Sequence, residues 1–88
     1  MSPAELELLR IALAQSLRAT GYAQTLAILL VSAKQAGFRD VTEAAVRSEV
    51  QYLADKGLVV ADEKTISPEN KRWRITAAGR DWLAQEGM

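Results

Sequence analysis

The spacing of apolar residues changes after Gly57, and this change limits the folds open to the chain. Before Gly57, apolar residues recur at intervals of three and four, which predicts amphipathic helices. After it, "LVVADEKTI" is rich in branched apolar residues, and "KRWRIT" alternates strictly, with Trp73 and Ile75 on one side of a strand. The two segments are therefore expected to pair as an antiparallel hairpin, with its turn at "SPEN", residues 67–70.

Helix start and stop signals divide the segment before the hairpin into three helices. Ser2, Pro3 and Glu5 form a capping signature at the N-terminus, Thr42 is a good N-cap for the third helix, and a glycine follows each helix. Thr76 is expected to cap a short closing helix after the hairpin. The predicted helices span residues 3–20, 23–36, 43–56 and 77–87.

The first two helices carry more apolar surface than one core-facing stripe requires. Additional apolar residues must be covered either by another helix or by a second subunit. We favour a second subunit, which predicts a homodimer through the first two helices, with Ile11 and Val31 in contact. The core stripe of the first helix is predicted as Leu6, Leu9, Leu13 and Leu17, and the additional residues as Leu8, Ile11, Ala12, Ala14, Ile28 and Val31.

Composition and length are typical of a single domain covering residues 1–88. The chain is 49% apolar and 25% charged, which describes a folded chain rather than a disordered one. Three helices followed by a hairpin and a short helix predict a fold that is mainly α with a small antiparallel β-hairpin, in the α+β class. The charge balance is neutral, with eleven basic and eleven acidic residues, so binding to nucleic acid would require a local basic patch.

Missing residue types argue against most of the chemistry found in small domains. The sequence contains no cysteine and no histidine, which excludes disulfides, thiolate nucleophiles, imidazole bases and zinc sites built on these ligands. We expect no enzymatic activity, no cofactor and no metal. Acidic Glu5 and Glu7 stand where a signal peptide would be basic, and "LAILLV", residues 26–31, is too short to span a bilayer. A cytoplasmic location without membrane contact is expected.

The order of helices and hairpin resembles the winged helix-turn-helix family of small bacterial and phage DNA-binding proteins. "VRSEVQYLADKGLV", residues 46–59, resembles the family's recognition helix and its exit into the wing. "RITAAGRDWL", residues 74–83, is similar to the "Leu-Thr-x-x-Gly-x-x-x-Leu" segment that ends the wing in many bacterial regulators. The chain also looks like winged-helix proteins of Mu-like prophages, in which a Leu-rich first helix precedes an "ISPE…RRWR" wing; here residues 66–74 read "ISPENKRWR".

This resemblance implies a sequence-preferring protein that binds double-stranded DNA and regulates transcription in a phage or bacterium. The recognition helix would enter the major groove, where Arg pairs well with guanine, Gln with adenine, and an alanine methyl can touch thymine. The basic residues of the wing would hold the phosphate backbone. The implied DNA-binding residues are Thr42, Ala44, Arg47, Ser48 and Gln51 on the helix, and Lys71, Arg72 and Arg74 on the wing.

One departure from the family pattern keeps a second function open. Recognition helices of the family are often basic, whereas Arg47 here stands between Glu43 and Glu49. The alternative is a winged-helix module that binds another protein and not DNA, using the apolar surface of the first two helices.

Overall fold

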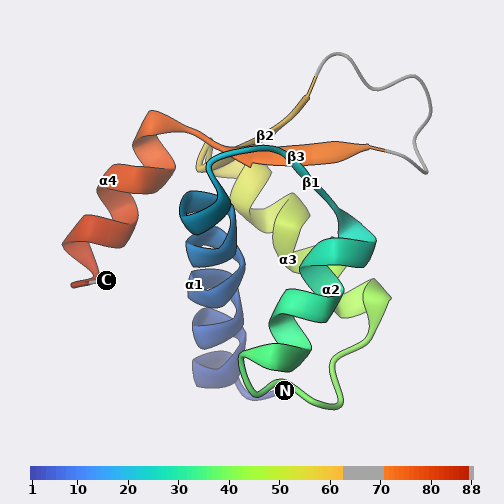
Figure 1. Ribbon diagram of the computed structural model, residues 1–88. Helices are drawn as coiled ribbons and strands as arrows, with labels where there is room; N and C mark the ends of the chain where they lie inside the picture. The colour runs from blue at the N-terminus through green and yellow to red at the C-terminus, as the bar shows by residue number, and fades with distance from the viewer. Residues whose placement is uncertain (63–70, 88) are drawn as a thin grey trace.

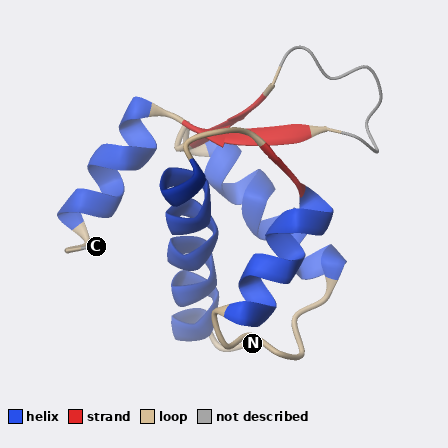
Figure 2. Cartoon of the chain, viewed as in Figure 1, coloured by secondary structure: helices blue, strands red, loops and turns tan. Residues whose placement is uncertain are grey.

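The chain folds into helices on one side of a small antiparallel sheet (Figure 1, Figure 2). The structure is a computed structural model that describes residues 1–62 and 71–87. This architecture confirms the predicted α+β class, and the turn predicted at residues 67–70 lies outside the described residues. The elements are α1 (Pro3–Thr20), β1 (Gln24–Thr25), α2 (Leu26–Gln35), α3 (Glu43–Asp55), β2 (Val59–Ala61), β3 (Arg72–Ile75) and α4 (Ala77–Gln85).

The capping contacts predicted for the first helix are all present in α1. The Ser2 hydroxyl accepts from the Glu5 backbone N–H at 3.2 Å, and the Glu5 carboxylate accepts from the Ser2 N–H at 3.5 Å. At the other end, Gly21 adopts a φ of 72° and its N–H donates to Leu17 O at 3.1 Å. α1 therefore begins and ends where the sequence predicts.

A third strand, which the sequence pattern did not predict, changes the start of the second helix. Gln24 and Thr25 pair with Trp73 and Arg72, so β3 is the central strand in the order β1-β3-β2. Buried Gln24 also donates from Nε2 to the Thr20 hydroxyl at 2.7 Å. The expected start at residue 23 is wrong for this reason, and α2 begins at Leu26 with Thr25 as its N-cap.

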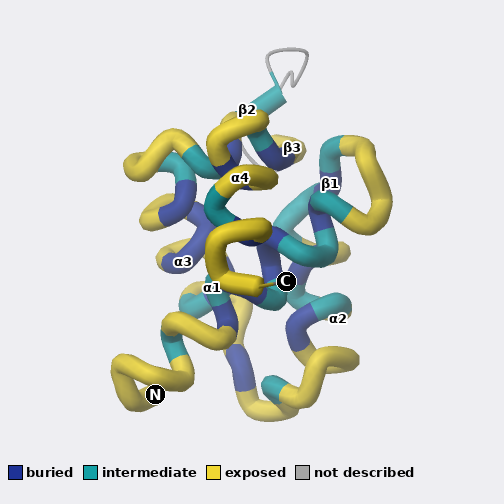
Figure 3. Tube along the Cα trace, turned by 90° about the vertical axis from the view of Figure 1, so that its left-hand side faces the viewer, coloured by how far each residue is buried: buried dark blue, intermediate teal, exposed yellow. Residues whose placement is uncertain are grey.

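The hydrophobic core lies between the four helices and the sheet, and Figure 3 shows the exposed turns outside it. On β3, buried and exposed residues alternate as predicted. Leu6 is only partly buried, whereas the other three leucines of the predicted stripe are fully buried. The largest core side chains include Leu9, Leu13, Leu17, Leu29, Val46, Val50, Leu53, Val59, Trp73, Ile75 and Leu83.

The additional apolar residues of α1 are covered largely from within the chain. Ile11 is only 7% exposed and Ala14 is fully buried, and α2, α3, α4 and β3 all pack against α1 (Figure 1). The expected role of Ile11 in a dimer contact is therefore wrong. Leu8, Ile28 and Val31 remain exposed.

The start of α4 is fastened to the corner between α3 and β2. The Thr76 hydroxyl donates toward the carbonyl oxygens of Gly57 and Leu58, at 2.7 and 3.0 Å, and accepts from the Gly79 N–H at 3.0 Å. Gly79 is buried against Leu58, so the helix approaches the corner closely at this point. This contact fixes where the later residues of α4, including Trp82, lie.

Candidate nucleic-acid interface

The helix predicted to recognise DNA buries one face and presents the other to solvent. Thr42 caps α3, because its hydroxyl accepts from the Ala45 N–H at 3.1 Å. Val46, Val50 and Leu53 recur at intervals of three and four and are buried in the core. The opposite face of the helix is therefore exposed.

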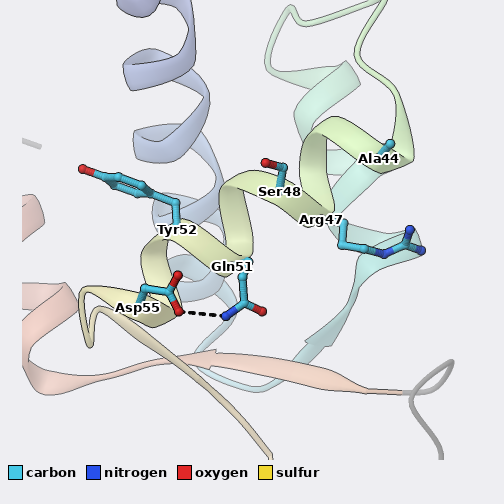
Figure 4. A pocket seen from close by; sticks show the side chains of 6 residues that line it. All are labelled: Ala44, Arg47, Ser48, Gln51, Tyr52 and Asp55. Atoms are coloured by element: carbon cyan, nitrogen blue, oxygen red, sulfur yellow. Dashed lines mark hydrogen bonds between the residues drawn. The ribbon is translucent and has the colours of Figure 1, made fainter.

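Four of the five predicted helix residues lie together on this exposed face, and we call them the α3 stripe: Ala44, Arg47, Ser48 and Gln51. They line a shallow depression, which Tyr52 and Asp55 complete (Figure 4). Thr42 does not line this depression, and its hydroxyl is engaged in the helix cap.

Two members of the α3 stripe are paired with carboxylates one turn away. Arg47 donates to Glu43 at 3.0 Å. Gln51 Nε2 donates to Asp55 Oδ1 at 2.9 Å, as Figure 4 shows. Exposed i,i+4 ion pairs are worth about 0.3–0.5 kcal/mol, so a phosphate or a base edge could displace Glu43 at small cost. The acidic neighbours lower the positive potential along this face without locking Arg47 in place.

The predicted wing residues form a second group, on the sheet. Arg72 and Arg74 are exposed and alternate with buried Trp73, so they point to the face of the sheet opposite the core. Val60 pairs with Arg74 across the strands and is also exposed. Lys71 lies on the Trp73 side instead, with Nζ 5.1 Å from the centre of the tryptophan ring. None of these residues lines the depression of the α3 stripe.

A largely buried ion pair joins α1 to α3. Arg10 donates to Glu49 at 3.1 Å, and the guanidinium carbon lies 3.7 Å from the centre of the Tyr52 ring. Glu49 is only 5% exposed, so it does not act as a solvent-facing neighbour of Arg47.

Periodicity could have located Glu49. It lies three residues after Val46 and four before Leu53, on the same helical face as Val50. Its partner Arg10 lies in a different helix, far away in the sequence, and no local pattern identifies such a pair.

Within the described residues, no group of three or more Asp or Glu side chains is placed to hold a metal ion, and no helix is long and apolar enough to cross a membrane. Comparison with protein families, with characterised proteins and with solved structures finds no match.

Proposed function

We propose that the protein is a winged helix-turn-helix module that binds double-stranded DNA with a preference for sequence, as a cytoplasmic transcriptional regulator of phage or bacterial origin. In this proposal α3 enters the major groove, and the hairpin of β2 and β3 is the wing that contacts the backbone. The observation that carries the proposal is the α3 stripe. It is polar and exposed, and it lies on the helix that precedes the hairpin.

The side chains of the α3 stripe suit base recognition. Arg47 has the bidentate geometry that fits guanine, and Gln51 has the amide that fits adenine. Ala44 and Ser48 are small, so they would let the helix approach the floor of the groove. Glu43 and Asp55 compete with DNA for the side chains of Arg47 and Gln51. Non-specific binding to the phosphate backbone is therefore expected to be weak, and base contacts should contribute a larger share of the affinity.

The wing supplies the positive charge that the helix lacks. Arg72 and Arg74 lie on one face of β3, and Lys71 adds a third cation at the start of the strand. Each phosphate contact contributes about −0.9 to the slope of log K against log salt. With Arg72 and Arg74 in contact with phosphates the slope would be about −1.8 per monomer, and Lys71 would bring it to about −2.7.

Titration of a random duplex pool at several salt concentrations tests the wing. Replacing Arg72 and Arg74 together by alanine should reduce the slope by about 1.8, because two phosphate contacts are lost. The matched control removes the same charge elsewhere, through Lys34→Ala on α2 and Arg80→Ala on α4, both at exposed positions. A flat salt response of the wild-type protein would contradict DNA binding, and equal slopes for the two double variants would contradict the wing.

Selection of bound duplexes from the same pool tests base reading. The wild-type protein should enrich a defined sequence, and Arg47→Ala should lose the preference at one position while keeping overall binding. Arg39→Ala, which removes an exposed arginine in the turn before α3, is the control. Enrichment that survives Arg47→Ala unchanged would remove α3 from base recognition.

A protein-binding module is the second candidate, and the exposed side chains of α2 favour it. Ile28 and Val31 are 51% and 53% exposed and lie one helical turn apart. A hydrogen bond of 3.1 Å between the hydroxyls of Ser16 and Ser32 holds α1 beside α2, so both helices can contribute to one surface. A homodimer through this surface is part of our proposal.

Sedimentation of the wild-type protein and of an Ile28→Ser, Val31→Ser variant tests the dimer. Concentration-dependent association that the double variant abolishes would support it, and a wild-type monomer at micromolar concentration would refute it. Association without any affinity for duplex DNA would favour the protein-binding module.

A further inference from the structure

A second concave site lies away from the α3 stripe, where α4 meets α1 and the corner between α3 and β2. This cleft has a volume of about 310 Å³ and is lined by Glu7, Arg10, Tyr52, Lys56, Leu58 and Trp82. Binding sites for small molecules range from about 300 to 1,000 Å³, so the cleft would hold a ligand of about one ring with a short substituent.

The walls of the cleft are suited to a planar group. Tyr52 and Trp82 are the two aromatic residues that line it, and Leu58 adds an apolar surface between α3 and β2. Aromatic side chains bind flat rings by stacking or by edge-to-face contact. Tyr52 is 39% exposed even though the Arg10 guanidinium packs over its ring, so part of its surface remains available to a ligand.

One charged group of the cleft, the Lys56 ammonium, is placed to hold an anion. The charge of Arg10 is compensated by buried Glu49, at 3.1 Å. Lys56 is exposed, its Nζ lies 5.6 Å from the centre of the Tyr52 ring, and within the described part of the chain it forms no ion pair. Arg10 Nε is buried and has no hydrogen-bond acceptor among the described residues. Glu7 is the acid that opposes Lys56 at the cleft.

We propose that this cleft binds a small aromatic monoanion, with the ring between Tyr52 and Trp82 and the carboxylate at Lys56. The site goes beyond the proposed DNA binding and does not depend on it, because no residue of the α3 stripe or the wing lines the cleft. Tyr52 borders both the cleft and the depression beside the α3 stripe, so a bound ring would contact a side chain that also reaches the interface.

Titration of the ¹⁵N-labelled protein with three related probes tests the site. Phenylacetate has the ring and the charge, phenylacetamide has the ring alone, and cyclohexylacetate has the charge without the planar ring. Phenylacetate should bind in the millimolar range or tighter, with saturable shifts at the amides of Tyr52, Lys56 and Trp82. The other two probes should bind at least about fivefold more weakly, which corresponds to losing one modest contact.

Variants with opposite expected effects separate this site from non-specific binding to apolar surface. Lys56→Gln should weaken phenylacetate about fivefold, and Glu7→Gln should strengthen it about twofold, because the first removes an attraction and the second a repulsion. Lys34→Gln, an exposed lysine on α2, should change nothing. Circular dichroism confirms that each variant is folded.

The proposal would be overturned by any of three results. These are no saturable shift with phenylacetate up to about 20 mM, equal affinity for the acid and the amide, or equal effects of Lys56→Gln and Lys34→Gln. Shifts that spread over α2 instead of the cleft would also overturn it, because they would place the ligand on a different surface.

Discussion

Substitution of Gly79 by alanine tests how tightly α4 is joined to the rest of the fold. In an exposed helix, glycine to alanine is expected to stabilise by about 1 kcal/mol, because alanine has the better helix propensity. Gly79 lies in the first turn of α4 and is buried. A Cβ at this position would lie well inside contact distance of the Leu58 carbonyl oxygen and 2.7 Å from Ile75 Cγ1.

The steric term should exceed the propensity term. The nearest obstacle is a backbone oxygen that Thr76 also holds at 3.0 Å, so it cannot turn aside as the end of a side chain would. Overpacking costs about 1–3 kcal/mol, and moving α4 outward would also expose part of Leu83, whose full burial is worth about 1.5–3 kcal/mol. After subtracting the gain in propensity, we expect Gly79→Ala to lower the free energy of unfolding by about 1–3 kcal/mol.

Urea unfolding followed by circular dichroism measures this loss. With a slope near 1 kcal/mol per molar urea, the midpoint should fall by about 1–3 M. Ala78→Gly is the matched control, because Ala78 is the exposed neighbour in the same helix and should lose only about 0.5–1 kcal/mol. An increase in stability for Gly79→Ala would show that α4 follows propensity alone, and it would refute the close packing of α4 on Leu58.

The remaining predictions concern the polar contacts that hold the helices together. Glu49→Met should destabilise the protein by about 3–5 kcal/mol because it leaves Arg10 largely buried without its carboxylate, whereas the double substitution Arg10→Met, Glu49→Met should be milder in the same urea assay. A double variant less stable than Glu49→Met would contradict this account. Thr76→Ala should lower the free energy of unfolding by about 1–2 kcal/mol, because it removes the cap of α4 and the hydrogen bond to the corner between α3 and β2. Thr76→Ser keeps the hydroxyl and should retain most of this stability. Equal losses for the two variants would mean that the hydroxyl is unimportant.

Local signals in the sequence predicted most of the helices and the hairpin. The caps at Ser2, Thr42 and Thr76 depend on residues three positions apart, and the alternation around Trp73 depends on its immediate neighbours. Such features are visible in a single sequence because cause and effect lie within one turn or one strand. The exposed position of Arg47 followed in the same way from the period of α3.

Features that join distant segments were missed or misassigned. Strand β1 has only two residues, which is too few to show an alternating pattern. These residues form a strand because they pair with β3. The sequence shows that Ile11 is apolar but not what covers it, and in the structure other elements of the same chain leave it only 7% exposed. Hydrophobic burial is non-directional, so an apolar stripe does not specify what covers it.

The sequence by itself determined where α1, α3 and α4 begin, which faces of α3 and β3 are buried, and the absence of cysteine and histidine chemistry. Only the tertiary structure decided that Glu49 pairs with Arg10, that the α3 stripe and the wing arginines form separate groups, and that Tyr52, Lys56 and Trp82 share a cleft. The physical reason is range: backbone propensity and periodicity act between near neighbours, whereas charge pairing and cleft formation depend on which distant surfaces the packing of the core brings together.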